Sequence, residues 1–432
     1  MSLLYDNLGV QNGHLTFCGY DTAALAQQHG TPLMLLDEQR IRNRCRAYLQ
    51  AMSQYLPEGS HPMYASKALS IKRIYEIMAE EGMGVDVVSR GELYTAVKAG
   101  FPMERACFHG NSKTDEDILF AMEHGIGSFV CDGMDELAAV NTLAAGKGIR
   151  QKVLLRLAPG IDPHTHEKIS TGRIDCKFGT AIETGQAEEF VRSALTMENI
   201  DMAGYHCHIG SQIFEAEPFY DAVRLMLQFV ALMGEKYGYY PRELDIGGGM
   251  GVPYTKADEA IDYGENIRAI GECVQNVCRE LNLQPPAIVM EPGRSIVADA
   301  GMTLYHVTAI KEIPGFKNYV AVNGGMADNP RYALYNAEYT VLAADRMEDK
   351  TDFLCTVAGC CCESGDLLQE DVCLPKMRRG DLLAVLTTGA YNYSMASNYN
   401  RIPRPPIVVI GENGPYTAVR RESLDDLLKC DT

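Results

Sequence analysis

The stretch Met63-Tyr64-Ala65-Ser66-Lys67-Ala68-Leu69-Ser70 opens the part of the chain that decides the fold. It is typical of a short β-strand that follows Pro62 and leads into a helical segment. A lysine in such an apolar stretch is unusual, because burying an ammonium group is costly unless the group is paired or loses its proton. Lys67 therefore has two interpretations. It extends its amine into water, or it keeps a neutral amine that can bind a carbonyl carbon covalently.

The same pattern, a short apolar strand followed by a helical segment, occurs eight times between Pro62 and Gly293. Strands that alternate with helices pair in parallel, and eight such units over roughly 230–260 residues predict an α/β fold with a closed (β/α)8 TIM barrel. The alternative is an open doubly wound sheet, but no G-x-G-x-x-G fingerprint follows a strand near the start of the chain. The eight strands are MYASKA, GVDVVS, ACFHGN, GSFVCD, VLLRLAP, AGYHCHIG, ELDIGGG and AIVMEPG.

From about residue 300 the pattern changes to strand-like segments that are separated by turns, with little helix. Such a pattern predicts an antiparallel β-sandwich or β-barrel domain at the C-terminal end. The strand-like segments near the N-terminus lie outside the eight strand–helix units, so they can join the β domain. We therefore expect a barrel domain over residues 34–295 and a β domain made of residues 1–33 and 296–432.

Composition and charge restrict the possible partners of this 432-residue chain. Its net charge of −18 argues against nucleic acid and anionic membrane surfaces, since both need basic patches. No apolar run has the length of a membrane span, and the first residues lack the features of a signal peptide. The 14 cysteines are scattered through apolar segments, which favours free thiols and a cytoplasmic location.

Chemically useful residues end almost every predicted barrel strand, and active sites of barrels lie at the carboxyl ends of their strands. The glycine cluster Gly247-Gly248-Gly249 is typical of a phosphate site, because glycines let backbone N–H groups approach a phosphate closely. Glu291 can act as a general base, a metal ligand or the partner of a heterocyclic nitrogen, or it can pair with Arg294. The residues at the strand ends are Lys67, Ser89, His109, Asp132, Arg156, His208, Gly247 and Glu291.

A metal site is a competing hypothesis for the same strand ends. His206 and His208 lie two residues apart, on one face of a predicted strand. Some barrel hydrolases hold a metal with such a pair, provided that other strand ends supply further ligands. His109, Asp132 and Glu291 are available for that role, so a metal-dependent barrel hydrolase is an alternative from a different class.

Taken together, these motifs resemble the fold type III decarboxylases that use pyridoxal 5′-phosphate, whose barrel is like that of alanine racemase. The resemblance covers nearly the whole chain, and it implies decarboxylation of meso-2,6-diaminopimelate to L-lysine and CO₂ in lysine biosynthesis. The motifs that carry it are YASKA, DVVSRGEL (Asp86–Leu93), HGNSK (His109–Lys113), THEKISTG (Thr165–Gly172), KFG (Lys177–Gly179), HCHIGSQ, DIGGGMG, EPGRS, CESGD and GAYNYSMAS (Gly389–Ser397).

The resemblance also implies roles for single residues. Lys67 would bind the cofactor as a Schiff base, and Cys362 would protonate the product carbon. The other implied cofactor contacts are Asp86, His208, Ser211, Gly247, Gly248, Gly249, Glu291, Arg294 and Tyr391. The implied substrate contacts are Arg294, Arg331, Tyr335, Glu363 and Tyr391. Cys362 would act from a partner subunit, so the resemblance implies a homodimer in which the β domain completes the active site at the dimer interface.

The sequence departs from this family pattern at a few positions. Asn323 replaces the usual Asp, Tyr332 replaces the usual Pro, and two extra cysteines, Cys360 and Cys361, precede Cys362. These changes leave room for a related decarboxylase that acts on D-ornithine, D-lysine or another basic amino acid. A catalytically inactive, cofactor-binding regulator is a further alternative, but Lys67, Glu291 and Cys362 are all present.

Overall fold

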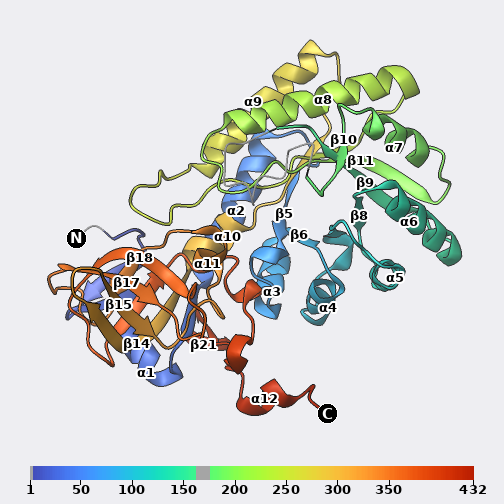
Figure 1. Ribbon diagram of the computed structural model, residues 1–432. Coiled ribbons are helices and arrows are strands. Elements are labelled where there is room, and N and C mark those ends of the chain that lie inside the picture. The colour runs from blue at the N-terminus through green and yellow to red at the C-terminus, as the bar shows by residue number, and fades with distance from the viewer. Residues whose placement is uncertain (1–2, 162–175) are drawn as a thin grey trace. The chain divides into compact units, whose positions relative to one another are not determined.

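The computed structural model describes residues 3–161 and 176–432, and the chain divides into two compact units. The barrel unit contains residues 42–251 and 261–295, and the β unit contains residues 1–41, 252–260 and 296–432. Both are drawn in Figure 1. The motif at residues 165–172 lies outside the described residues. Within the described ranges, no helix has the length and apolar character needed to cross a membrane.

The barrel unit is built on parallel strands that close into a ring, as the sequence predicts. Strands β9-β11-β12-β13-β5-β6-β7-β8 are neighbours in this order, and a further pairing of β8 with β9 closes the barrel. The strands are β5 (His61–Ala65), β6 (Gly84–Val87), β7 (Ala106–Phe108), β8 (Ser128–Cys131), β9 (Gln151–Ala158), β11 (Ile200–His206), β12 (Glu243–Asp245) and β13 (Ala287–Met290). A short strand, β10 (Thr180–Ala181), adds to β9.

Helices follow the barrel strands and lie on the outside of the ring (Figure 1). They form where apolar residues recur every three or four positions, as Ile267, Ile270 and Val274 do along the buried face of α9. The helices that follow barrel strands are α3 (Lys72–Glu81), α4 (Arg90–Lys98), α5 (Asp115–Glu123), α6 (Met134–Lys147), α7 (Gln186–Ala194), α8 (Glu217–Tyr237) and α9 (Tyr263–Glu280). A further helix, α2 (Glu38–Tyr55), comes before the first barrel strand, β5. Asp37 caps the start of α2, because the N–H of Arg40 donates to Asp37 Oδ1 at 3.0 Å.

Apolar side chains fill the interior of the ring. One buried cluster takes a residue from each of five strands, namely Met63, Cys107, Val130, Leu154 and Val289. A barrel that is packed in this way has no central pore. Its chemistry is therefore confined to the polar residues at the strand ends.

The β unit holds a sheet with strand order β18-β17-β15-β14-β4-β20-β21, and β16 and β19 pair beside β14. Most pairings are antiparallel, as predicted, but β15 with β17 and β20 with β4 are parallel. Each parallel pair is joined by a long stretch of chain, which allows the crossover that parallel strands need. The strands are β4 (Leu33–Asp37), β14 (Gly301–Ile313), β15 (Lys317–Val322), β16 (Val341–Ala343), β17 (Phe353–Ala358), β18 (Leu367–Leu374), β19 (Leu382–Leu386), β20 (Ile407–Gly411) and β21 (Gly414–Val419).

The compact units differ from the predicted domain bounds at residues 34–41 and 252–260, which cluster with the β unit. Strand β4 explains the first difference. All of its residues are buried, and it pairs with β14 on one side and with β20 on the other, so it is a central strand of that sheet. The smaller elements of the β unit are β1 (Leu8–Gln11), β2 (His14–Phe17), β3 (Tyr20–Asp21), α1 (Thr22–His29), α11 (Arg331–Tyr335) and α12 (Leu424–Leu428).

Candidate active site

The carboxyl ends of the barrel strands collect most of the residues that were predicted to bind the cofactor. Lys67 follows β5, Asp86 lies near the end of β6, and Glu291 follows β13. Strand register aligns these ends, since Ala65 lies opposite Asp86 and His206 lies opposite Asp245. One end of the barrel thus carries the lysine, the carboxylates and the histidines.

Lys67 lies in a short 3₁₀ turn, Ser66–Ala68, directly after β5. Its side chain is exposed while both neighbours are buried, because the turn directs it out of the packed layer. The N–H of Ser66 donates to Asp86 Oδ1 at 3.2 Å. Burial, and next the charge of Lys67, lower the pKa of His208 well below its usual value. The lysine amine is therefore close enough to His208 to influence it electrostatically.

The glycine cluster forms a turn that no other residue type fits. Gly247 and Gly249 have φ angles of 70° and 125°, which side chains rarely allow. A Cβ at Gly248 would lie 2.1 Å from the carbonyl oxygen of Glu291. The backbone therefore lies bare between the ends of β12 and β13, as a site that receives a phosphate through N–H groups requires.

Arg294 and Ser211 meet at the same end of the barrel. Arg294 donates to Ser211 Oγ from Nε at 3.3 Å and from Nη2 at 3.0 Å, and only 6% of the arginine is exposed. The hydroxyl and the guanidinium are both suited to binding an anion. The structure thus brings together two of the residues that were predicted to bind the cofactor.

Glu291 contacts two histidines. Its Oε1 lies 3.0 Å from His109 Nε2, and its Oε2 lies 3.4 Å from His206 Nε2. We call these three buried residues the carboxylate cluster. Its donor atoms all lie within 4.8 Å of one another, so the cluster could also hold a metal ion.

The metal hypothesis had placed Asp132 and His208 among the possible ligands, and neither belongs to the cluster. Asp132 instead accepts a hydrogen bond of 2.9 Å from the N–H of Gly179, and its Oδ1 lies 3.6 Å from Arg156 Nε. His206 ends strand β11, whereas His208 lies beyond it. The two histidines therefore take different neighbours, although the sequence placed them on one face.

Glu92, which was not among the predicted site residues, supports the turn that carries Lys67. Glu92 Oε2 accepts hydrogen bonds from Ser66 Oγ at 2.9 Å and from the N–H of Val88 at 2.8 Å. A signal was available, because Ser89 and Glu92 have the Ser-x-x-Glu spacing of a helix start. Ser89 does cap α4, but the glutamate reaches back past the cap to the turn that carries Lys67.

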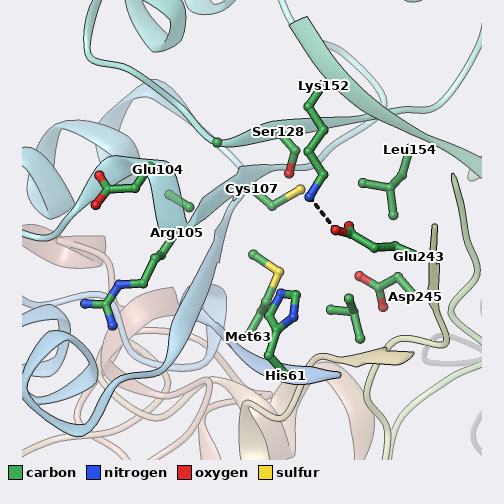
Figure 2. Close-up of a pocket in the computed structure, with 13 residues that line it drawn as sticks. His61, Met63, Glu104, Arg105, Cys107, Ser128, Lys152, Leu154, Glu243 and Asp245 are labelled. Carbon is green, nitrogen blue, oxygen red and sulfur yellow. Dashed lines mark hydrogen bonds and ion pairs between the residues drawn. The ribbon is translucent and has the colours of Figure 1, made fainter. Parts of the chain in front are cut away.

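A small cavity of about 80 Å³ lies where the barrel strands begin, at the end opposite to the candidate site. There Lys152 of β9 and Glu243 of β12 form an ion pair of 2.6 Å, as Figure 2 shows. Asp245 also lines this cavity, and its Oδ1 accepts a hydrogen bond of 2.8 Å from the N–H of Gly247. Asp245 therefore connects the cavity at the start of the strands with the glycine turn at their carboxyl ends.

In the β unit, Arg331 begins helix α11 and is held by aromatic residues. Its guanidinium carbon lies 4.9 Å from the ring centre of Tyr254 and 5.7 Å from that of Tyr339. Its Nη1 also donates to the Tyr339 hydroxyl at 2.9 Å. Tyr335, which was predicted to act with Arg331, ends the same helix. The structure thus fixes Arg331 through Tyr254 and Tyr339, which were not among the predicted site residues.

Cys362 and Glu363 lie in the loop between β17 and β18, and both are exposed. Asp366 organises this loop, because its carboxylate accepts hydrogen bonds from the N–H groups of Cys361 and Met326, each at 2.6 Å. All 14 cysteines of the chain are free thiols, as expected. The loop therefore presents a thiol and a carboxylate side by side.

Tyr391 has a φ angle of 61°, a left-handed conformation that is uncommon for a tyrosine. Its neighbour Asn392 is buried, donates to the carbonyl oxygen of Thr388 at 3.2 Å and accepts from the Tyr339 hydroxyl at 3.2 Å. Such backbone strain persists where the surroundings enforce it, and it often accompanies functional residues.

The departures from the family pattern have structural partners. Asn323 donates to the carbonyl oxygen of Thr31 at 2.9 Å and accepts from the N–H of His306 at 2.9 Å, so it links the chain segments on either side. The hydroxyl of Tyr332 donates to Glu370 Oε2 at 2.8 Å. Both contacts lie within the β unit and give these two residues a structural role.

Residues 38–298 match the family model for the pyridoxal binding domain of pyridoxal-dependent decarboxylases. The chain is 45% identical to the diaminopimelate decarboxylase of Bacillus subtilis over 423 residues, which are 98% of this chain and 96% of that protein. It is also similar to the crystal structure of diaminopimelate decarboxylase from M. jannaschii in complex with L-lysine, with a TM-score of 0.90, 35% identity and coverage of 99% and 98% of the two chains. The Helicobacter pylori enzyme complexed with L-lysine gives a TM-score of 0.85 and 32% identity, covering 95% of this chain and 98% of that one.

Proposed function

Because the chain belongs to the family of pyridoxal-dependent decarboxylases, we propose that it converts meso-2,6-diaminopimelate to L-lysine and CO₂. The observation that carries the proposal is the carboxyl end of the barrel. A lysine, a bare glycine turn, an arginine and a buried carboxylate meet there. A relative that is complexed with L-lysine, the product of this reaction, supports the choice of substrate.

The described residues fit pyridoxal 5′-phosphate. The phosphate needs backbone N–H groups and cationic or hydroxyl donors, and the turn at Gly247–Gly249, Ser211 and Arg294 supply them. The ring nitrogen needs an ionised acceptor. His109 and His206 counteract the effect of burial and hold the pKa of Glu291 well below its usual value. Glu291 is therefore a carboxylate that can accept a hydrogen bond from a protonated ring nitrogen.

When bound, pyridoxal 5′-phosphate supplies an electron sink for the pair that stays on the α-carbon when CO₂ departs. Lys67 provides the amine that holds the cofactor covalently, and Asp86 lies beside its turn. His208, whose pKa is lowered by burial and next by the charge of Lys67, covers the cofactor ring. Tyr391 contributes a further contact from the β unit.

The β unit provides the groups that recognise the rest of the substrate. Arg331 and Tyr335, together with Arg294 of the barrel unit, bind the distal carboxylate, because guanidinium groups pair with carboxylates in a fixed geometry. The carboxylate of Glu363 forms an ion pair with the distal ammonium group of the substrate. Cys362 Sγ carries the proton that the product carbon receives. These roles explain why an exposed loop carries both a thiol and a carboxylate.

The active form is a cytoplasmic homodimer in which each site uses both chains. In a two-fold dimer every contact is reciprocal, so a loop that reaches the neighbouring site completes both sites. The Cys362–Glu363 loop of one chain then serves the Lys67 of the other. The 14 free thiols fit a reducing compartment.

The test is a visible spectrum together with product analysis. The purified protein should be yellow, and borohydride followed by peptide mapping should place the cofactor on Lys67. Incubation with meso-2,6-diaminopimelate should release equal amounts of L-lysine and CO₂. A colourless protein that carries stoichiometric zinc on the carboxylate cluster would instead establish the hydrolase alternative.

A further inference from the structure

The carboxylate cluster is built from three distant parts of the barrel. Glu291 follows β13, His109 follows β7, and His206 ends β11. Each imidazole takes a different oxygen of the carboxylate, at 3.0 Å for His109 and 3.4 Å for His206. The two rings meet edge to face, with centroids 5.0 Å apart and planes at 74°. The histidines therefore approach Glu291 from two directions.

Burial makes this arrangement electrostatically demanding. At most 6% of each of the three residues is exposed, and a carboxylate in such a place is costly unless it is paired. Burial would lower the pKa of His109, but Glu291 and Cys107 raise it well above its usual value. Burial lowers the pKa of His206 to about 4, so that ring is neutral near pH 7. Glu291 thus has one cationic and one neutral neighbour.

We propose that His109 and His206 are positioning residues that hold Glu291 ready to accept a hydrogen bond from the ring nitrogen of pyridoxal 5′-phosphate. The inference rests on the proposed function, in which Glu291 meets that nitrogen. A carboxylate has about four lone-pair sites. One imidazole on each oxygen stops the carboxylate from rotating and still leaves a lone pair on each oxygen for the cofactor.

The glycine turn also helps to hold Glu291, through the backbone of that residue. The N–H of Glu291 donates to the carbonyl oxygen of Gly247 at 2.9 Å. The turn that serves the phosphate and the carboxylate that serves the ring nitrogen are therefore tied through one backbone hydrogen bond. A Glu291 side chain that lost its histidines would keep this anchor and change only its side-chain orientation.

The experiment measures how tightly variants bind the cofactor. His109→Phe and His206→Phe keep a ring of similar size but remove the donor nitrogen. His109→Gln and His206→Gln keep an amide donor. Cofactor-free protein is titrated with pyridoxal 5′-phosphate, and its dissociation constant is read from absorbance. The Phe variants should bind roughly tenfold more weakly or worse, as expected when Glu291 loses the ion pair with His109 or the hydrogen bond with His206, and the Gln variants should recover part of the loss.

Two controls separate positioning from a general loss of stability. His124→Phe changes a histidine on α5 whose Nδ1 contacts the carbonyl oxygen of Phe120, and it should bind the cofactor as wild type does. The double variant His109→Phe with Glu291→Gln should bind no more weakly than Glu291→Gln alone, because the histidine acts only through the glutamate. Additive losses in the double variant would overturn the inference.

Glu291→Gln also separates this inference from the proposed function. If Glu291→Gln binds the cofactor with wild-type affinity and an unchanged spectrum, the role of Glu291 in the proposed function is wrong. If Glu291→Gln binds weakly while His109→Phe and His206→Phe bind as wild type, only the role of the histidines is wrong. If a Phe variant fails to fold, the Gln variant of the same residue replaces it, both alone and combined with Glu291→Gln, and additive losses in that double variant would overturn the inference.

Discussion

The hydroxyl of Tyr339 accepts a hydrogen bond of 2.9 Å from Nη1 of Arg331 and in turn donates to Asn392 Oδ1 at 3.2 Å. The guanidinium also lies against the rings of Tyr254 and Tyr339. An arginine that is buried in this way has little freedom to turn. Its remaining N–H groups therefore point in a fixed direction, as the recognition of a planar carboxylate requires.

Tyr339→Phe should weaken substrate binding and leave the chemical step nearly unchanged. The substitution keeps the ring against Arg331 but removes one hydrogen bond, which is worth about 0.5–1.5 kcal/mol. We expect KM for meso-2,6-diaminopimelate to rise roughly two- to tenfold with kcat within a factor of about two. Tyr332→Phe is the matched control and should behave as wild type. It removes a hydroxyl from the same helix, but that hydroxyl donates to Glu370, whereas Arg331 donates to Tyr339. A fall in kcat at constant KM would contradict the assignment.

Substrates without a distal carboxylate should be poor. Leaving a buried charged partner unpaired costs about 2–5 kcal/mol, which corresponds to at least a roughly thirtyfold loss of kcat/KM. D-lysine and D-ornithine, compared with meso-2,6-diaminopimelate at equal enzyme concentration, measure this loss. Equal turnover of the three compounds would show that Arg294 and Arg331 do not recognise a carboxylate.

Asp86→Asn should stabilise the cofactor-free protein more at pH 8 than at pH 5. Burial, and next the charge of Glu291, raise the pKa of Asp86 from 3.8 to about 7. Between these values the folded state binds more protons than the unfolded state, so the free energy of unfolding falls as the pH rises. At pH 8 the wild type carries the cost of a buried charge, which the neutral Asn avoids. At pH 5 both side chains are neutral in the fold.

Thermal unfolding at the two pH values measures this effect. The gain in Tm from Asp86→Asn should be on the order of 2 °C or more at pH 8 and smaller at pH 5. Asp135→Asn, at an exposed position in the first turn of α6, is the control and should show no such difference. An equal effect of Asp86→Asn at both pH values would mean that Asp86 does not titrate near neutral pH.

The architecture of the barrel was accessible from the sequence because each strand carries a local signal. Short apolar runs such as GVDVVS end in a polar residue and precede a helix, and the structure confirms all eight of them. The glycine turn was accessible for the same reason, since three consecutive glycines exceed what an ordinary turn needs. The order of these signals along the chain was enough to define the ring.

The partners of Glu291 could not be predicted in this way. A pairing with Arg294, three residues away in the chain, was one of several interpretations of Glu291, and the structure shows that His109 and His206 contact the carboxylate. Contacts across a barrel interior depend on how the ring closes and on which rotamers the packed layer allows, and neither leaves a local pattern. The parallel pairing of β4 with β20 was hidden for the same reason, because these strands come from opposite ends of the chain.

Each active site is expected to use residues from two chains. Cys362 belongs to the β unit and Lys67 to the barrel unit, and a proton donor must reach the product carbon from the side away from the lysine. A neighbouring chain can supply a donor on that side. Lys67→Ala and Cys362→Ala should each be nearly inactive alone, since each removes one essential group from both sites of its dimer.

Mixing the two inactive variants should restore activity if the sites are shared. Under conditions that let subunits exchange, about half of the dimers become hybrids by random pairing. Each hybrid has one site with both substitutions and one site with neither, so activity should return to roughly a quarter of the wild-type value. Exchange is verified separately with a mass-labelled chain. If exchange is complete and activity stays absent, Cys362 acts within its own chain or has no part in the reaction, because no arrangement of shared sites leaves every hybrid inactive.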